Sequence, residues 1–496
     1  MPTPRLLVIA AWLLGGCATV GGVAERTDLA PDWVEVHTPH LHLWIELDPP
    51  SAIGLARSME AVRSALAAFW GLEFDPADRL EVVVFADRGS LTPYAGYGVG
   101  GYVVEAPSGP LLVMAANGVG GRAIASHELS HHLTAQALLR QPRWLGEGIA
   151  TYLETAQIDP SGASVTFGKP PAGISPNELA ANPLTLAQLW AWGSIDLTAK
   201  DAVRYYANAW WLVHHLIDAR GAQFDNFIRL LAGGGDPTAA WAQAFAGLTD
   251  AELEAELATA LARHELKNPS KPLQLRQIQP DAAPLTYAEL YALKAQLLSR
   301  TTVPLQKDEW QRQIEDQLES ALVLDDKNEL ALLLKSGLIR EDRARIEFLK
   351  TVVAKLPHSG RALGDLGVSL GRIGKDSRST FDRALELDPD DPVLINNAAL
   401  QALLEGDPAK ALELAQRAAA LRPYSATIVD TYAAALAAVG RCSEAVDRAH
   451  QAIDLLGHTA RSRPQLVARL HRYERDCGPG RPVAPTREPG FAATLQ

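Results

Sequence analysis

The sequence predicts an α+β domain, with a small mixed sheet and covering helices, followed by an α-solenoid of helical repeats. Residues 33–47 alternate between apolar and polar side chains, a period typical of a strand. Helical and strand-like segments then follow one another as far as residue 265. In the C-terminal part, small residues recur every 34 positions. A chain of 496 residues has room for two or three domains of this kind.

Composition narrows the classes of function. Apolar residues make up 47% of the chain and charged residues 21%, which is ordinary for a soluble globular protein. The net charge of -12 provides no broad cationic surface that would neutralise phosphates. We therefore expect no nucleic-acid partner.

The segment 1–16 is predicted to be a signal peptide. An apolar run from Leu6 to Leu14 follows Arg5, and it is too short to span a bilayer as a helix. The next residues complete "LGGC", which ends at Cys17 and resembles the bacterial lipobox. A plain secretory signal or a buried N-terminal strand is the alternative.

The lipobox resemblance implies cleavage before Cys17 and lipidation of its thiol. Acyl chains on one residue would anchor the protein to a membrane. Ala18 fits sorting to the outer membrane, so the resemblance implies a lipid-anchored protein of the bacterial cell envelope that faces the periplasm. Residues 17–32 are expected to form a tether.

The α+β domain is predicted to span residues 33–265. A strand over 33–47 should be followed by a helix over 52–71, a buried strand over 79–86 and a hairpin over 100–117. On the strand, His40, His42 and Trp44 alternate with the apolar residues. With His37 these histidines could form a metal site, but the alternation favours a solvent-facing or groove-facing surface.

Residues 266–285 are rich in proline and polar residues, and we interpret them as a linker or an extended crossover. Residues 286–476 are expected to form the repeats. Pro389 recurs one period later as Pro423, and the same step relates Ala384, Ala418 and Ala452, and also Ala411 and Ala445. This period, with small residues where helices touch, is the tetratricopeptide signature. An unrelated helical bundle is the alternative, and residues 477–496 are expected to form a flexible tail.

The chemical signal lies in "ASHELSHHLT", residues 125–134. His127 and His131 are four residues apart, so on a helix their imidazoles project from one face and can bind one Zn²⁺. Glu128 is rotated away from this face and would reach a water molecule rather than the metal. The arrangement is the HExxH motif, in which His132 is not expected to be a ligand.

A third ligand is predicted in "PRWLGEGIATYLE", residues 142–154. The stretch from His131 to Glu147 is long enough for the first helix to end and a second to run back. Gly148 would let the helices approach closely. Three protein ligands would leave the fourth zinc position open, as catalytic rather than structural zinc requires.

These elements resemble the gluzincin metallopeptidases, and most closely the bacterial peptidase MA-like family. The resemblance rests on the HExxH motif, on Trp144, Leu145, Glu147, Gly148, Ala150 and Tyr152, and on the segment 205–218. It implies a thermolysin-like fold and zinc-dependent hydrolysis of peptide bonds in a protein or peptide substrate, with Glu128 as general base.

The resemblance also implies a hydroxyl donor from a downstream helix. Tyr206 is the preferred residue, with Tyr205 and His214 as competitors, and ordinary aromatic packing is the alternative. Thr151 and Glu154 are the candidates for orienting the zinc ligands.

Three alternatives stay open. Cys442 and Cys477 permit a disulfide in an exported chain but do not require one. The strand 111–116 could be a sheet edge that pairs with substrate, or an interior strand. For the function, two hypotheses other than the peptidase remain. The whole protein could be a non-catalytic envelope scaffold that retains the peptidase fold and binds protein partners through its repeats. The zinc site could also be purely structural.

Overall fold

The computed structural model describes residues 28–72, 79–97, 99–104, 110–116, 121–195, 199–263, 266–300, 307–456, 463–478 and 482–483. The predicted signal peptide, Cys17 and most of the predicted tether lie outside the described residues. Within the described part, no helix combines the length and apolar character needed to cross a membrane.

The described residues of the N-terminal domain form two sheets. The larger is mixed, with strand order β4-β5-β3-β2-β1-β9, and the smaller is antiparallel, with order β6-β7-β8. The strands are β1 (Leu29–His37), β2 (Leu41–Ile45), β3 (Leu80–Phe85), β4 (Gly101–Val104), β5 (Leu111–Ala115), β6 (Gln157–Ile158), β7 (Ser164–Thr166), β8 (Ser270–Pro272) and β9 (Asp281–Thr286).

The predicted strand over 33–47 is instead two strands. β1 and β2 pair antiparallel, and the chain reverses over residues 38–40. His40 at this turn leaves the polar face, and its Nδ1 lies 2.8 Å from Oε2 of the buried Glu60. His40 therefore does not join His37 and His42, because the turn interrupts the alternation that a single strand would have kept.

Two predicted connecting segments are part of the sheets. The tether predicted over 17–32 ends earlier, because β1 begins at Leu29. The linker predicted over 266–285 supplies β8 to the small sheet and β9 to the edge of the large one. Proline and polar residues are tolerated there because an edge strand needs only part of its backbone paired. The strand 111–116 is interior as β5, and the edge at that end is β4.

The helices of this domain are α1 (Pro49–Trp70), α2 (Arg88–Ala95), α3 (Gly121–Ala137), α4 (Arg143–Leu153), α5 (Pro176–Ala181), α6 (Leu186–Ala191), α7 (Ala199–Ala219), α8 (Gly221–Ala232), α9 (Pro237–Ala244) and α10 (Asp250–Ala262), with a short 3-10 helix (Trp192–Ser194). The chain starts α1 at an Asp48 cap, whose carboxylate accepts from Ser51 N–H, and ends it at Gly71 in the left-handed conformation. α1 and α3 pack on one face of the large sheet.

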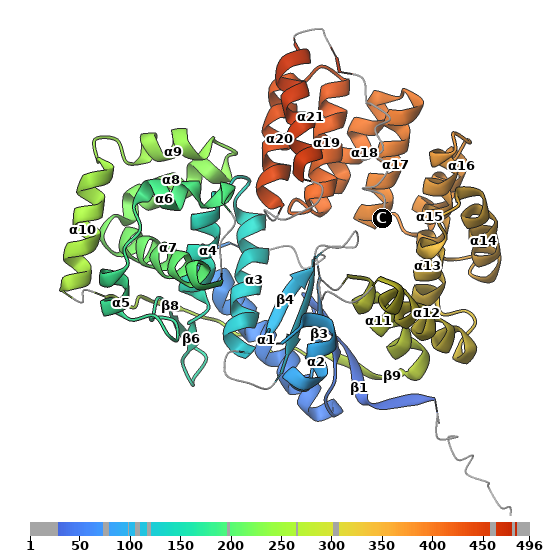
Figure 1. Ribbon diagram of the computed structural model, residues 1–496, viewed down its shortest axis with the longest axis horizontal. Helices are drawn as coiled ribbons and strands as arrows, with labels where there is room; N and C mark the ends of the chain where they lie inside the picture. Colours follow the sequence, from blue (N-terminus) through green and yellow to red (C-terminus); the bar gives the residue numbers. More distant parts are fainter. Residues whose placement is uncertain are drawn as a thin grey trace, which may run out of the picture.

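The solenoid consists of α11 (Tyr287–Arg300), α12 (Lys307–Leu324), α13 (Glu329–Leu338), α14 (Asp342–Lys355), α15 (Gly360–Arg372), α16 (Arg378–Leu387), α17 (Pro392–Glu405), α18 (Pro408–Leu421), α19 (Ala426–Ala438), α20 (Cys442–Leu455) and α21 (Arg463–Asp476). Successive helices pack on one another (Figure 1). Ala384, Ala418 and Ala452, which recur with the period of the sequence, are completely buried where the helices meet. The predicted α-solenoid is confirmed at the level of stacked helices.

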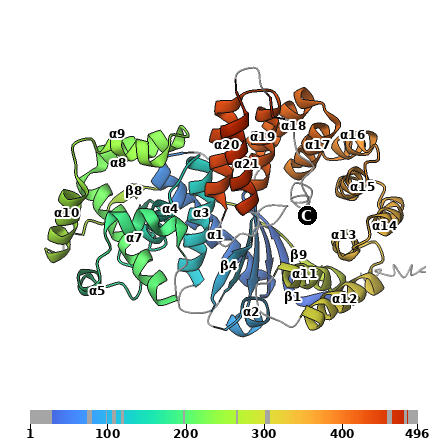
Figure 2. The same cartoon turned by 45° about the horizontal axis from the view of Figure 1, so that its top comes forward.

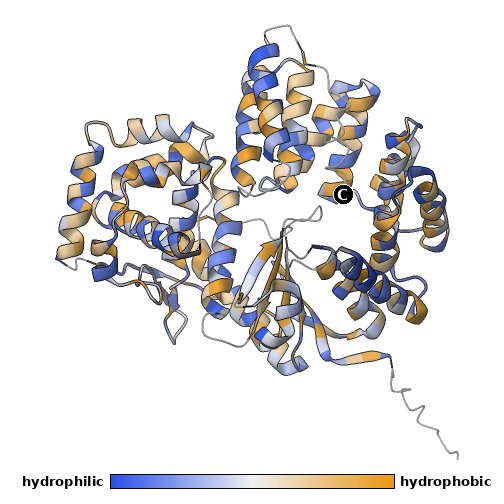
Figure 3. Cartoon of the chain, viewed as in Figure 1, coloured by the Kyte–Doolittle hydropathy of each residue, from blue (hydrophilic) through white to orange (hydrophobic). Residues whose placement is uncertain are grey.

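The first solenoid helices complete the core of the N-terminal domain. Trp33, Phe85 and Val113 on the second face of the large sheet share a buried cluster with Leu293 of α11 and Leu318 of α12. α12 is correspondingly amphipathic, and its hydrophilic residues colour much of it blue in Figure 3. The two parts of the chain are therefore joined by a common core rather than by a free linker.

The far end of the solenoid returns to the N-terminal domain. Figures 1 and 2 show the solenoid curving from the sheet until α20 and α21 lie near α3. Arg140, just after α3, donates from Nε to Asp454 Oδ2 of α20 at 2.5 Å. The ring of Tyr424 packs edge-on against His132 of α3, with centroids 4.7 Å apart. The solenoid thus contacts the N-terminal domain at both of its ends.

The predicted flexible tail is held at its start. Cys477 is disulfide-bonded, and the buried Val483 donates its N–H to the Ala437 carbonyl of α19 at 3.0 Å. Residues 484–496 lie outside the described residues.

Candidate metal centre

His127 and His131 lie side by side on α3. Their spacing of four residues places both rings on the same helical face, and the ring centroids are 4.8 Å apart. The two Nε2 atoms approach to 3.1 Å. Two ring nitrogens thus point at one location, as a shared metal ion requires.

α4 brings Glu147 to the same location. Its Oε2 lies 3.5 Å from His127 Nε2 and 3.3 Å from His131 Nε2. This oxygen is buried and makes no hydrogen bond within the described residues. Ligands held about 2.0–2.1 Å from Zn²⁺ in a tetrahedron lie roughly 3.3 Å from one another. The three separations of 3.1, 3.3 and 3.5 Å therefore fit three corners of a zinc tetrahedron.

The position of Glu147 depends on how closely α4 packs against α7. Trp144 and Leu145 are completely buried beneath the site. A Cβ atom on Gly148 would lie 2.7 Å from the Ala209 carbonyl oxygen and 2.7 Å from Val213 Cγ2. Only glycine fits at this position, so the close approach expected from the sequence is present.

The electrostatics of the cluster favour a cation. Burial alone would raise the pKa of Glu147, but the charge of His131 and contacts with His127 hold that pKa well below its usual range. Burial alone would lower the pKa of His127, but its contacts with Glu147 and Glu154 raise it to about 10. The carboxylates thus stabilise positive charge at the point where the ring nitrogens converge, whether a proton or a metal ion carries it.

Glu154 orients His127. The Nδ1–H of His127 donates to Glu154 Oε2 at 2.9 Å, which leaves Nε2 free to face Glu147. Glu154 comes seven residues after Glu147, nearly two helical turns, and so lies on the same side of α4. Of the two orienting residues expected from the sequence, Glu154 contacts a histidine, whereas the hydroxyl of Thr151 is buried and makes no hydrogen bond within the described residues.

Tyr206 of α7 faces the cluster. Its ring centroid is 6.0 Å from that of His127, and burial together with the charge of Glu147 raises the pKa of its hydroxyl. Its two competitors have other surroundings. Tyr205 is buried and packs on Trp192, a ring that Tyr206 also contacts, with centroids 5.3 Å apart. His214 is completely buried, with Nδ1 3.2 Å from Asp218.

Glu128 is half-buried and is not one of the three clustered ligands. Its charge nevertheless contributes to the raised pKa values of both His127 and Tyr206, which places its carboxylate near the cluster. His132 points away from the three ligands, and its Nε2 accepts from Gln136 at 2.9 Å. Both arrangements agree with the helical geometry expected from the motif.

Arg143 is a residue at the site that the sequence reasoning missed. Its Nε lies 3.7 Å from Glu147 Oε1, and its guanidinium lies over the Trp192 ring, 4.9 Å from the centroid. The available signal was its position four residues before Glu147, which places the two side chains on one face of α4. It adds a fixed positive charge beside the oxygen of Glu147 that does not face the histidines.

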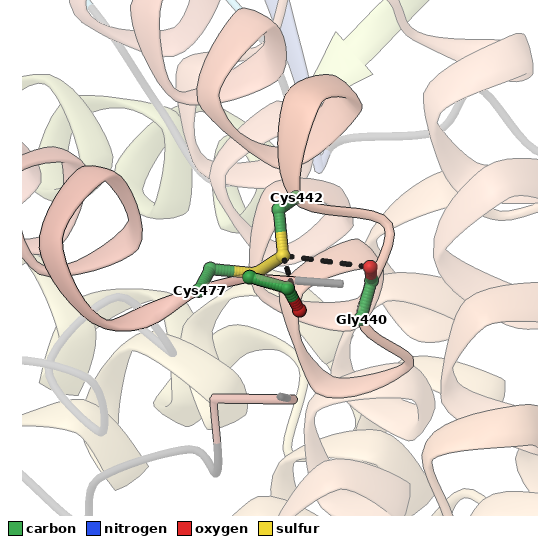
Figure 4. Close-up of a disulfide and its surroundings, with 4 residues drawn as sticks. Gly440, Cys442 and Cys477 are labelled. Carbon is green, nitrogen blue, oxygen red and sulfur yellow. Dashed lines mark hydrogen bonds between the residues drawn. A yellow bond between two sulfur atoms is a disulfide. The ribbon is translucent and has the colours of Figure 1, made fainter. Parts of the chain in front are cut away.

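The remaining predicted site residues lie far along the chain from this cluster. Cys442 at the start of α20 and Cys477 after α21 form a disulfide, with Cα atoms 5.5 Å apart (Figure 4). The bond joins the end of the last helix to the preceding one. Cys17 lies outside the described residues, as noted above.

No protein-family model and no curated protein matches the chain. Among solved structures, a thermophilic TPR protein of Thermus thermophilus (TTC0263) is 20% identical, with a TM-score of 0.30, and the match covers 38% of this chain and 98% of that one. The MamA protein is 18% identical over 34% of this chain and 91% of its own, with a TM-score of 0.26. PilW, a type IV pilus biogenesis factor, is 18% identical over 42% of this chain and 98% of its own, with a TM-score of 0.30.

Proposed function

We propose that the protein is a zinc-dependent metallopeptidase whose solenoid recruits the substrate or a partner protein. One observation carries the proposal: Nε2 of His127, Nε2 of His131 and Oε2 of Glu147 lie 3.1–3.5 Å from one another. The donor set of two imidazoles and one carboxylate is that of catalytic zinc sites, with a fourth position for water or substrate. The gluzincin resemblance of the sequence implies the same chemistry.

The residues around the cluster have distinct tasks in hydrolysis. Bound zinc would supply a Lewis acid that lowers the pKa of water to about 7 and polarises the scissile carbonyl. Glu128 would accept the proton of the attacking water and return it to the leaving amine. The hydroxyl of Tyr206, whose pKa is raised further above the neutral range, would donate to the oxyanion. Glu154 holds His127 in the orientation that the site requires.

The large sheet has an edge beside this site with which an extended substrate could pair. Within the described residues, β4 is one of the two edge strands of the large sheet, and α3 packs against both β4 and β5. An extended peptide could pair with the outer backbone groups of β4, which gives affinity with little dependence on side chains. We therefore propose an extended segment of a protein or peptide as substrate.

The decisive experiment compares the wild type with Glu128→Gln. Both proteins should bind one zinc at this cluster, while cleavage of a peptide library, followed by mass spectrometry, should fall at least about 100-fold in the variant. Glu413→Gln, at an exposed position of α18, is the matched control and should cleave as the wild type does. Tyr206→Phe should lose about 100-fold in kcat with its zinc retained. Equal cleavage by Glu128→Gln would contradict the mechanism.

A second candidate function is a non-catalytic scaffold. The observation that favours it is the solenoid, which runs from residue 287 to residue 476 and contacts the N-terminal domain at both ends. Stacked helical repeats commonly bind other proteins on extended surfaces. A wild type that holds zinc, cleaves no peptide in any library and captures the same partner proteins as Glu128→Gln would establish the scaffold instead.

We also propose that the mature protein is anchored by lipid on Cys17 in the bacterial cell envelope, at the outer membrane facing the periplasm. The lipobox-like "LGGC" supports this proposal. Cys17→Ser should move the protein from the membrane fraction to the soluble fraction. An unchanged distribution between the fractions would contradict it.

A further inference from the structure

A second group of metal-ligating side chains lies on the large sheet, away from the candidate metal centre. Glu35 and His37 belong to β1 and His42 to β2, and the strands pair with His37 directly opposite His42. Val34 and Val36, which alternate with the β1 pair, are buried in the cluster that includes α1 and α3. The group therefore lies on the opposite face of the sheet from His127 and His131.

The ligand atoms of the three side chains lie close together. His42 Nε2 donates to Glu35 Oε1 at 2.7 Å, and His37 Nε2 lies 3.6 Å from the same oxygen. The two imidazole rings stack with centroids 4.2 Å apart. One ligand atom from each residue lies within 4.8 Å of the others. The two separations from Glu35 lie on either side of the roughly 3.3 Å expected between ligands of a tetrahedral zinc ion.

The ion pair between Glu35 and His42 does not account for the position of His37. The hydrogen bond between Glu35 and His42 is complete without it. The 3.6 Å from its Nε2 to Glu35 Oε1 is too long for a good hydrogen bond. Coordination through Nε2 would give this ring a strong interaction without moving the strand.

A further carboxylate lies on the same face of the sheet, outside the group of three whose ligand atoms lie within 4.8 Å of one another, and the group is open to solvent. Asp281 of β9 pairs with His37 in the sheet register, so both side chains lie on the same face. The side chains of His37, Glu35 and His42 are 36%, 34% and 23% exposed, which leaves the group open to solvent. Because β1 lies between β2 and β9, one ion held there would connect three strands.

We propose that Glu35, His37 and His42 form a second binding site for a divalent transition-metal ion of the zinc class, with Asp281 as the fourth ligand. Two imidazole nitrogens favour zinc, copper or nickel over magnesium or calcium, which take oxygen ligands. The ion connects β1 to β2 and β9, next to the first solenoid helices. The site needs none of the residues assigned to peptide hydrolysis, so it stands independently of the proposed function.

The test is zinc stoichiometry of the full-length protein, measured by titration of the metal-free chain and by elemental analysis after dialysis. The wild type should bind two equivalents. His42→Gln should bind one and keep its zinc at His127 and His131. The double variant His127→Ala/His131→Ala should bind one, and adding His42→Gln to it should abolish zinc binding.

Matched controls separate this site from adventitious binding. His471→Gln, at an exposed position of α21, should still bind two equivalents. Circular dichroism checks folding, and Glu35→Gln replaces His42→Gln if the latter does not fold. A wild type that binds a single equivalent, lost in the His127→Ala/His131→Ala variant, would overturn the second site and leave the first intact. A second equivalent that survives both His42→Gln and Glu35→Gln would also overturn it.

Discussion

Removing the carboxylate of Glu154 should weaken zinc binding without removing a zinc ligand. Its Oε2 accepts from His127 Nδ1–H at 2.9 Å, which fixes the ring and raises the basicity of the opposite nitrogen. Loss of such an outer carboxylate typically costs about 10–100-fold in metal affinity, or roughly 1.4–2.7 kcal/mol. We expect about 100-fold for Glu154→Ala. Glu154→Gln should lose about 10-fold, because its amide oxygen can still accept the hydrogen bond but carries no charge.

The assay is competition between the protein and a chelator of known zinc affinity, with Glu413→Gln as the control for a surface glutamate. A folding check by circular dichroism excludes general damage, since Glu154 ends α4. If a folded Glu154→Ala protein bound zinc with an affinity within a factor of two of the wild type, the contact between Glu154 and His127 would have no effect on zinc affinity. The same reasoning predicts that Thr151→Val changes zinc affinity little, because the Thr151 hydroxyl makes no hydrogen bond within the described residues.

Three further predictions concern stability and packing. In metal-free protein the pKa of His127 is raised from 6.5 to about 10, so its contribution to stability is complete below pH 6.5 and is lost as the pH rises through about 10. Metal-free melting temperatures should therefore fall over this range, and the gap to zinc-loaded protein should widen. Gly148→Ala would push a methyl group against the Ala209 carbonyl, and we expect about 1–3 kcal/mol of destabilisation in denaturant unfolding, with weaker zinc binding. Arg140→Ala would leave the half-buried Asp454 without this partner and should lower the free energy of unfolding by about 3 kcal/mol. The variant should also be cleaved faster by proteases where the solenoid meets α3. Unchanged unfolding curves for either variant would contradict the packing described.

Local helical geometry made part of the candidate metal centre predictable. The four-residue spacing of His127 and His131 fixes their rings on one face of any helix, so no tertiary information was needed for that pair. Glu147 could be proposed as the third ligand because a second helix that begins after Pro142 and runs back would carry its carboxylate towards the two histidines. Its actual approach depends on α4 packing directly against the backbone of α7 at Gly148, which is a property of the folded core.

Other site residues could not be chosen from the sequence. Thr151 and Glu154 both lie on the side of α4 that carries Glu147, and only the reach of the longer side chain and the rotation of the helix decide that Glu154 contacts His127. Tyr205 and Tyr206 are adjacent, so they project about 100° apart on α7, and helix rotation again decides which one faces the site. Arg143 was overlooked because a charged residue early in a helix is ordinarily solvent-exposed.

The same division holds for the whole fold. Features that repeat over short distances follow from the amino-acid sequence: the helical face with two imidazoles, the alternating strands, and the regular period of stacked helices. The tertiary structure alone decided which distant segments meet: β9 joins the sheet edge, α11 and α12 cover its second face, and the last repeats return to α3. Periodicity is set by backbone geometry within a few residues, whereas long-range pairing is set by the surfaces left unburied once all local elements have formed.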